Sequence, residues 1–217
     1  QVAGGVAWHV AGGRTARWGG AFAVDGLDCS GGTGEVCGWL GPAGWGKTTL
    51  LHVLAGLEAP SDGRVEIDGG AVTGHDYRWG VVFQDPLLYP WLSVRENVAI
   101  GPRLRGEEPE ADHVDDLLKL VGLDGFEDAA PADLSGGMAQ RASLARTLAN
   151  EPEVLLLDEP FSALDQLTKM ELQDELRRIV DELGVTTVFV THDIDEAVYL
   201  GDRVAIMGTI PHGIEHV

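Results

Sequence analysis

The chain has 217 residues, of which 44% are hydrophobic and 23% are charged, a composition that suits a globular protein with ample material for a core. Its 35 acidic and 15 basic residues give a formal net charge of −20, which repels the phosphate backbone of nucleic acids and argues against non-specific nucleic-acid binding. No uncharged apolar run approaches the roughly 18 residues that cross a bilayer, so the sequence predicts no membrane span.

The first part of the chain is rich in glycine and weak in periodicity, which predicts short strands and turns. Its two cysteines, Cys29 and Cys37, lack metal-ligand spacing, so we expect small buried hydrophobic side chains in a reducing compartment.

Clearer patterns begin near Glu35, and from there strands alternate with helices. In chain order we expect a strand at residues 36–40, a helix at 47–57, strands at 64–69 and 79–83, helices at 111–123 and 138–150, a strand at 154–160, a helix at 172–184, a strand at 186–192, a short helix at 193–200 and a strand at 203–207.

The middle of the chain, residues 93–150, forms a mostly helical block. Within it, Val114, Leu117, Leu118 and Val121 fall on one face of an amphipathic helix. Strands that alternate with helices around such a block predict a parallel α/β core with a helical insertion.

We expect this arrangement to form one folded unit over residues 1–217. Its core would come from about residues 1–84 and 153–217, and a helical subdomain from about residues 85–152.

The glycine-rich loop after the first expected strand fits G-x-x-x-x-G-K-[ST], with Gly41, Gly46, Lys47 and Thr48 at the specified positions. The glycines let backbone N–H groups cradle phosphates, while Lys47 would neutralise the β- and γ-phosphates and Thr48 would place a hydroxyl on Mg²⁺. The alternative is a glycine-rich turn with a chance lysine, which the flanking strand and helix disfavour. Trp45 is unusual here, because its ring could crowd the phosphates or project outward. The predicted phosphate-contacting loop is Gly41, Pro42, Ala43, Gly44, Trp45, Gly46, Lys47, Thr48 and Thr49.

Two carboxylates close the apolar run at residues 154–160, at the strand end where open α/β sheets bind ligands. Asp158 would hold Mg²⁺ and Glu159 would orient and activate an attacking water. Taken alone, such a pair is as often a solvated strand end. His192 and Gln84 also follow expected strands, and by themselves they fit a capping histidine and an ordinary polar amide.

Taken as a set, these motifs resemble an ATP-binding cassette ATPase domain. The phosphate loop, Gln84, LSGGMAQ at residues 134–140, VLLLDEP, SALD at residues 162–165 and His192 occur in that family's order and approximate spacing. The resemblance extends from about residue 18 to about residue 207. It implies a P-loop NTPase (RecA-like) parallel-sheet core with an antiparallel β subdomain and an inserted helical subdomain.

The resemblance also implies roles for single residues. Trp18 would stack on the adenine of ATP, for which an indole face is chemically suitable. Gln84 would contact Mg²⁺ and the attacking water, and would relay to a membrane partner. His192 would contact the γ-phosphate, and the loop at residues 162–165 would cross between protomers. The implied catalytic residues are Lys47, Gln84, Glu159 and His192, and the implied Mg²⁺ ligands are Thr48, Gln84 and Asp158.

The second glycine-containing motif has a separate implied role. In this family such a segment closes over ATP held by the phosphate loop of a second copy, in a head-to-tail dimer. The residues expected to contact that nucleotide are Ser135, Gly136, Gly137 and Gln140.

Within the family, the segments at residues 84–106 and 191–204 resemble the nitrate, sulfonate and taurine importer group. This implies transmembrane permease subunits as partners, an indirect link to a solute-binding protein, and a cytoplasmic position on the inner face of the membrane. Leu87, Leu88, Tyr89 and Trp91 could form the docking groove for the permease, or could pack the joint between subdomains.

Two other functions compete with the importer subunit. One is a cassette ATPase that acts on nucleic acid or ribosomes, which the acidic charge disfavours. The other is a non-hydrolysing regulatory cassette, because Trp45 and Ala139 depart from the residues usual at their positions.

The acidic composition predicts that salt stabilises the fold, because screening weakens repulsion among the 35 acidic residues. We expect the melting temperature to rise by several degrees between dilute buffer and molar KCl, as followed by circular dichroism. An unchanged melting temperature would contradict the hypothesis of salt adaptation.

Overall fold

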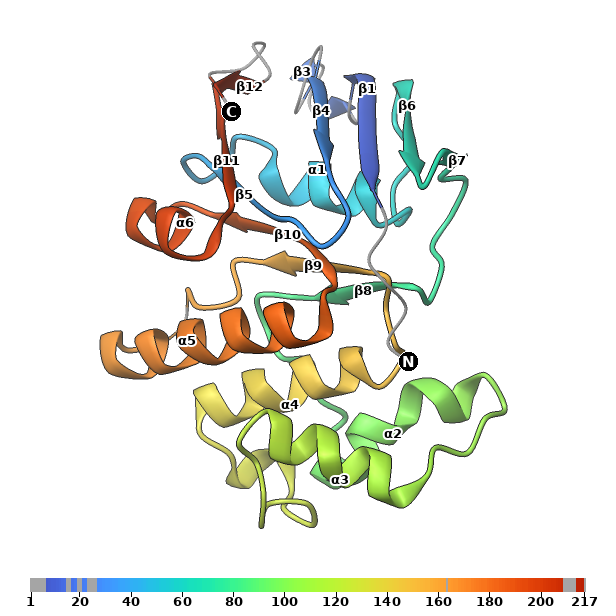
Figure 1. The fold of residues 1–217 in the computed structure, drawn as a ribbon, viewed down its shortest axis with the longest axis vertical. Coiled ribbons are helices and arrows are strands. Elements are labelled where there is room, and N and C mark those ends of the chain that lie inside the picture. Colours follow the sequence, from blue (N-terminus) through green and yellow to red (C-terminus); the bar gives the residue numbers. More distant parts are fainter. Residues whose placement is uncertain are drawn as a thin grey trace.

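The computed structural model describes residues 7–14, 17–18, 21–22, 27–162, 164–208 and 214–216 (Figure 1). A six-stranded sheet forms the centre, and all its strands run parallel except β12. Its order is β12 (Ile214–His216), β11 (Arg203–Met207), β5 (Val36–Leu40), β10 (Thr186–Thr191), β9 (Val154–Asp158) and β8 (Trp79–Val82).

The central strands β9 and β10 are buried along their whole length, which explains why β9 reads as an unbroken apolar run. Because side chains alternate along a strand, Leu155 and Leu157 of β9 enter one hydrophobic cluster while Val154 and Leu156 enter another.

On one face of this sheet lie α1 (Lys47–Leu54) and a second, antiparallel sheet (Figure 1). The second sheet has the order β4 (Leu27–Gly31), β1 (Trp8–Arg14), β6 (Asp62–Ile67) and β7 (Gly70–Ala71), and a short pair joins β2 (Arg17–Trp18) to β3 (Ala21–Phe22). The two sheets meet where the rings of Trp8 and Trp39 pack edge to face with centroids 5.6 Å apart. Cys29 and Cys37 are buried in the same cluster, as predicted.

The remaining helices lie on the other face of the parallel sheet (Figure 1). They are α2 (Val94–Leu104), α3 (Ala111–Leu120), α4 (Gly136–Leu148), α5 (Gln166–Leu183) and α6 (Ile194–Leu200), with a 3₁₀ turn at Pro131–Asp133 before α4. One hydrophobic cluster runs from α2 and α3 through α4 and α5 to the sheet, so the helical block shares its core with the sheet. No helix in the described ranges is long and apolar enough to cross a membrane.

The strands and helices match the sequence expectations in type, and they differ mainly at their ends. The largest difference is α5, which begins at Gln166 rather than near 172 because the Asp165 carboxylate accepts from the amides of Leu167 and Thr168 and caps the helix. The helix ends as predicted at Gly184, whose φ of 62° suits glycine. The amphipathic face of α3 is also confirmed, since Val114, Leu117, Leu118 and Val121 are all buried.

The centre of the sheet leaves no room for a side chain at Gly38 of β5. A Cβ built there would lie 2.7 Å from Cζ of the fully buried Phe189. We expect Gly38→Ala to lower the free energy of unfolding by about 1–3 kcal/mol, because the phenyl ring cannot move without displacing its neighbours. Urea denaturation measures the change. Gly32→Ala is the matched control, since its nearest atom would be 3.6 Å away, and an equal loss in both variants would refute the packing explanation.

Candidate functional site

The loop between β5 and α1 adopts the backbone that the glycine motif predicts. Gly44 and Gly46 both have a φ of 82°, a left-handed conformation that favours glycine, and Gly46 immediately precedes the first residue of α1. Gly41, at the start of the loop, donates its amide to the carbonyl oxygen of Thr191 at the end of β10. The loop is therefore anchored to the carboxyl edge of the sheet, and the N–H groups that open α1 can receive an anion.

Lys47 is buried, with 4% of its side chain exposed. Its ammonium group donates to the carbonyl oxygens of Gly41 at 2.7 Å and Pro42 at 3.0 Å, and lies 3.5 Å from Oε1 of Glu159. The ammonium group therefore stands between the phosphate loop and the end of β9, where it can neutralise an anion bound by the loop.

Thr48 and Asp158, the two residues predicted to hold Mg²⁺ together with Gln84, lie side by side. The Thr48 hydroxyl donates to Oδ1 of Asp158 at 2.9 Å, and burial raises the pKa of the Asp158 carboxyl while this hydrogen bond opposes the rise. A hydroxyl and a carboxylate are hard oxygen donors that suit Mg²⁺, which is usually held by one or two protein oxygens together with phosphates. In the described part of the chain no three His, Cys, Asp or Glu side chains gather to hold a metal by themselves.

Glu159 connects the ends of three strands. Its Oε2 lies 3.1 Å from Nδ1 of His192, its Oε1 faces Lys47, and its backbone amide donates to the carbonyl oxygen of Val190. Its φ of 43° is left-handed, which is rare for a side chain other than glycine and costs about 1–3 kcal/mol. Glutamate, lysine and histidine thus form one row at the carboxyl edge of the sheet.

Gln84 follows β8 at the same edge of the sheet as this row. Val82 of β8 pairs with Leu157 of β9, so Gln84 and Glu159 both stand two residues beyond this pair. The residue is exposed. The carbonyl oxygen of the preceding Phe83 accepts a hydrogen bond of 3.1 Å from the Gln140 amide.

The motif around Ser135 stands apart from the row. Ser135 caps α4, since its Oγ accepts from the amide of Met138, and Gly136 is exposed beside it. Gly137 is buried, and a Cβ there would lie 2.5 Å from Thr168 of α5. In Figure 1 the first turn of α4 lies well away from the phosphate loop, so this surface faces outward rather than toward its own chain's site.

Gln140 differs from the expectation that it contacts nucleotide. Its side chain is 6% exposed and its amide nitrogen is committed to Phe83 of its own chain. The helical period explains the difference, because residue 140 lies more than one turn beyond Ser135 and faces the sheet.

Two predicted tryptophans and the loop at residues 162–165 can be placed only in part. The Trp45 ring is partly exposed and lies beside the start of the loop, with its Cε3 3.8 Å from where a Cβ of Gly41 would stand. For Trp18 the structure describes the backbone in β2, and the side chain lies outside the described part, so adenine stacking stays a prediction. In the loop at residues 162–165, Ser162 Oγ donates to the Glu159 carbonyl oxygen, while Ala163 lies outside the described residues.

The segment after Gln84 exposes apolar side chains, as expected of a docking surface. Leu87, Tyr89 and Trp91 are 60%, 38% and 74% exposed, whereas Leu88 packs against the hydrophobic core. Tyr89 lies at the edge of a mostly apolar cavity of about 400 Å³. The cavity is also lined by Leu57, His75, Tyr77, Trp79, Gly80, Val81, Phe83, Ile100, Gly101, Leu104, Arg105, Arg146, Thr147 and Asn150.

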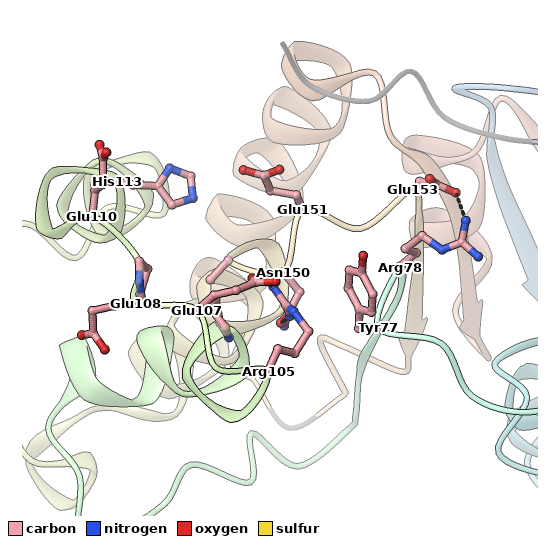
Figure 2. A pocket seen from close by; sticks show the side chains of 13 residues that line it. Tyr77, Arg78, Arg105, Glu107, Glu108, Glu110, His113, Asn150, Glu151 and Glu153 are labelled. Atoms are coloured by element: carbon pink, nitrogen blue, oxygen red, sulfur yellow. Dashed lines mark hydrogen bonds and ion pairs between the residues drawn. The ribbon is translucent and has the colours of Figure 1, made fainter.

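A second, acidic pocket of about 560 Å³ adjoins this cavity and was not anticipated from the sequence (Figure 2). The two share Tyr77, Arg105 and Asn150, and the Arg105 guanidinium lies 4.5 Å from the centre of the Tyr77 ring. In the acidic pocket, five glutamates come from the turn between α2 and α3 and from the turn before β9, segments that no motif links.

Comparisons with known proteins agree with these motifs. Residues 24–162 match the ABC transporter family. Over 180 residues the chain is 47% identical to a taurine import ATP-binding protein from Jannaschia sp. (strain CCS1), which covers 82% of this chain and 67% of that protein. Over 215 residues it is 45% identical to an aliphatic sulfonates import ATP-binding protein from Xanthomonas axonopodis pv. citri (strain 306), which covers 98% of this chain and 84% of that protein.

The fold is similar to that of a solved ATP-binding cassette, a dimer in a post-hydrolysis state bound to ADP and Pi. The TM-score is 0.80 at 31% identity, over 92% of this chain and 93% of that chain. This likeness confirms the predicted parallel-sheet P-loop NTPase fold with its antiparallel and helical parts. With the family match over residues 24–162 and relatives at 45–47% identity, the chain belongs to the ABC transporter family.

Proposed function

We propose that the chain is the ATP-hydrolysing subunit of an importer for small sulfonates such as taurine. The observation that carries the proposal is the row formed by Lys47, Glu159 and His192 beside the Thr48–Asp158 pair. The import activity and solute class are supported by the relatives named above, whose printed functions are taurine and aliphatic sulfonate import. We expect the solute to be selected by the permease and the solute-binding protein rather than by this chain.

Each side chain of the row has a task in phosphoryl transfer to water. Lys47 neutralises the charge of the β- and γ-phosphates, and Glu159 accepts a hydrogen bond from the attacking water and aligns it. His192 holds the Glu159 carboxylate in place and donates toward the γ-phosphate. Mg²⁺, held by Thr48, Asp158 and Gln84, would supply further charge neutralisation to the phosphates.

We propose that two copies assemble head to tail around two ATP molecules. Each phosphate loop then faces the exposed Ser135 and Gly136 of the other copy, which supply a hydroxyl and helix-terminal N–H groups. Two chains at −20 each repel one another, so bound Mg²⁺ and ATP would form the bridge that holds them. Loss of the γ-phosphate on hydrolysis removes the bridge and favours the open pair.

The membrane partner is proposed to be a permease that docks beside Gln84. Leu87, Tyr89 and Trp91 supply exposed apolar surface there, next to the apolar cavity between α2 and β8. A subunit bound in this way would lie on the inner face of the membrane, and would serve a solute-binding protein only through the permease.

Glu159 is the carboxylate proposed to activate the attacking water. Glu159→Gln should slow ATP hydrolysis by about 100-fold or more, because the amide cannot accept a proton. Since ATP is then retained, the variant should double its mass by light scattering when Mg²⁺ and ATP are added. Glu151→Gln, on an exposed residue in the turn before β9, is the matched control. Normal turnover in Glu159→Gln would remove the residue from its proposed role.

A substitution at Ser135 separates the two halves of the composite site. In the Glu159→Gln background, Ser135→Arg should abolish ATP-dependent dimerisation while leaving ATP affinity of the monomer within about twofold, measured by titration with a fluorescent ATP analogue. The long side chain would block the face that closes over the partner's nucleotide.

Ser135 also caps α4, so a variant that keeps the cap is needed. Ser135→Asp retains a capping oxygen and should also prevent dimerisation, because its charge repels the γ-phosphate. Weaker ATP binding by the monomer in both variants would show instead that the motif serves its own chain.

A further inference from the structure

Arg146 of α4 has unusual surroundings for a chain so rich in acidic residues. Its guanidinium donates to the carbonyl oxygens of Pro86 at 2.8 Å and Leu87 at 2.7 Å, and to Oγ of Ser143 at 3.2 Å. Within the described residues it has no carboxylate partner, and burial lowers the pKa of its guanidinium. Burying part of a cation among neutral acceptors costs free energy, because no carboxylate then neutralises its charge. This cost indicates that Arg146 has a specific structural role.

A second donor from the same helix holds the other side of Gln84. The buried Gln140 amide donates to the carbonyl oxygen of Phe83 at 3.1 Å. Gln140 and Arg146 therefore hold the backbone immediately before and shortly after Gln84.

The held backbone is strained at the point where Arg146 binds it. Leu87 has a φ of 47°, a conformation that side chains larger than glycine rarely adopt. Its side chain is 60% exposed, so burial of that side chain does not explain why this backbone conformation is kept. The hydrogen bond from Arg146 is accepted by the carbonyl oxygen of this same residue, so it acts at the strained position.

We propose that Gln140 and Arg146 are positioning residues that fix the Gln84 segment, residues 83–87, to α4. Because Ser135 begins the same helix, Gln84 and Ser135 would then move as one body. The proposal rests on the proposed function, in which these two residues serve different ATP molecules of the dimer. Docking of a permease beside Leu87 would in this way shift both Gln84 and Ser135, and so would affect both ATP sites of the dimer.

The experiment follows the mobility of the Gln84 segment directly. A nitroxide label is placed at Asp85→Cys, an exposed position inside the segment, in Glu159→Gln protein, where the buried Cys29 and Cys37 do not compete for the label. Without nucleotide, Arg146→Met should raise label mobility at least twofold by electron paramagnetic resonance. With Mg²⁺ and ATP, the parent should show a change in mobility on dimerisation, and Arg146→Met should lose that change while its mass still doubles.

Arg141→Met is the matched control, because Arg141 lies on the same helix but pairs with Glu175. It should leave label mobility unchanged. In chains that retain Glu159, Arg146→Met should lower kcat about tenfold with KM for ATP within twofold, and Arg146→Lys should recover part of the loss by holding one carbonyl.

Equal mobility in the Arg146→Met and Arg141→Met chains would overturn the proposal. If Arg146→Met does not fold, the nearly isosteric Gln140→Met decides, with a smaller rise in mobility expected and no rise overturning the proposal. If the parent itself fails to dimerise with ATP, the proposed function fails, while the nucleotide-free mobility still tests the fixation of the segment.

Discussion

The site depends on the parallel register that brings the ends of β5, β9 and β10 to one edge. This register places the phosphate loop next to Glu159 and His192, although the loop lies more than a hundred residues before both of them in the chain. Glu159 then occupies a left-handed backbone conformation while it bridges a lysine and a histidine. The buried strands β9 and β10 hold the backbone next to this turn in place, and their packing maintains the strained conformation.

The second organising constraint is the division of the core into two hydrophobic clusters by the parallel sheet. One cluster joins the sheet to α1 and the antiparallel strands, and the other joins it to α2, α3, α4 and α5. The helical block is therefore packed continuously on the sheet that carries the catalytic row. Its relation to the site is set by side chains at the contact, such as those that α4 directs toward the end of β8.

Much of the fold and the site could be predicted, because their signals are local. The apolar run before Asp158, the glycines around Lys47 and the face of α3 each reflect a single strand, turn or helix. Other features depend on partners distant in sequence. That Gln140 turns inward follows from the position of Phe83, and the early start of α5 follows from the Asp165 cap. The acidic pocket is formed by segments that meet only in the folded chain, so no local sequence pattern predicts it.

Because α4 is long, a small movement where it contacts the Gln84 segment produces a larger movement at its other end. Arg146 lies eleven residues beyond Ser135, and at 1.5 Å per residue the two are about 16 Å apart along the helix. A rotation of α4 by about 10° about Arg146 would displace Ser135 by about 3 Å. That displacement is as long as a hydrogen bond, so a small tilt at one end of α4 is enough to make or break a contact at the other.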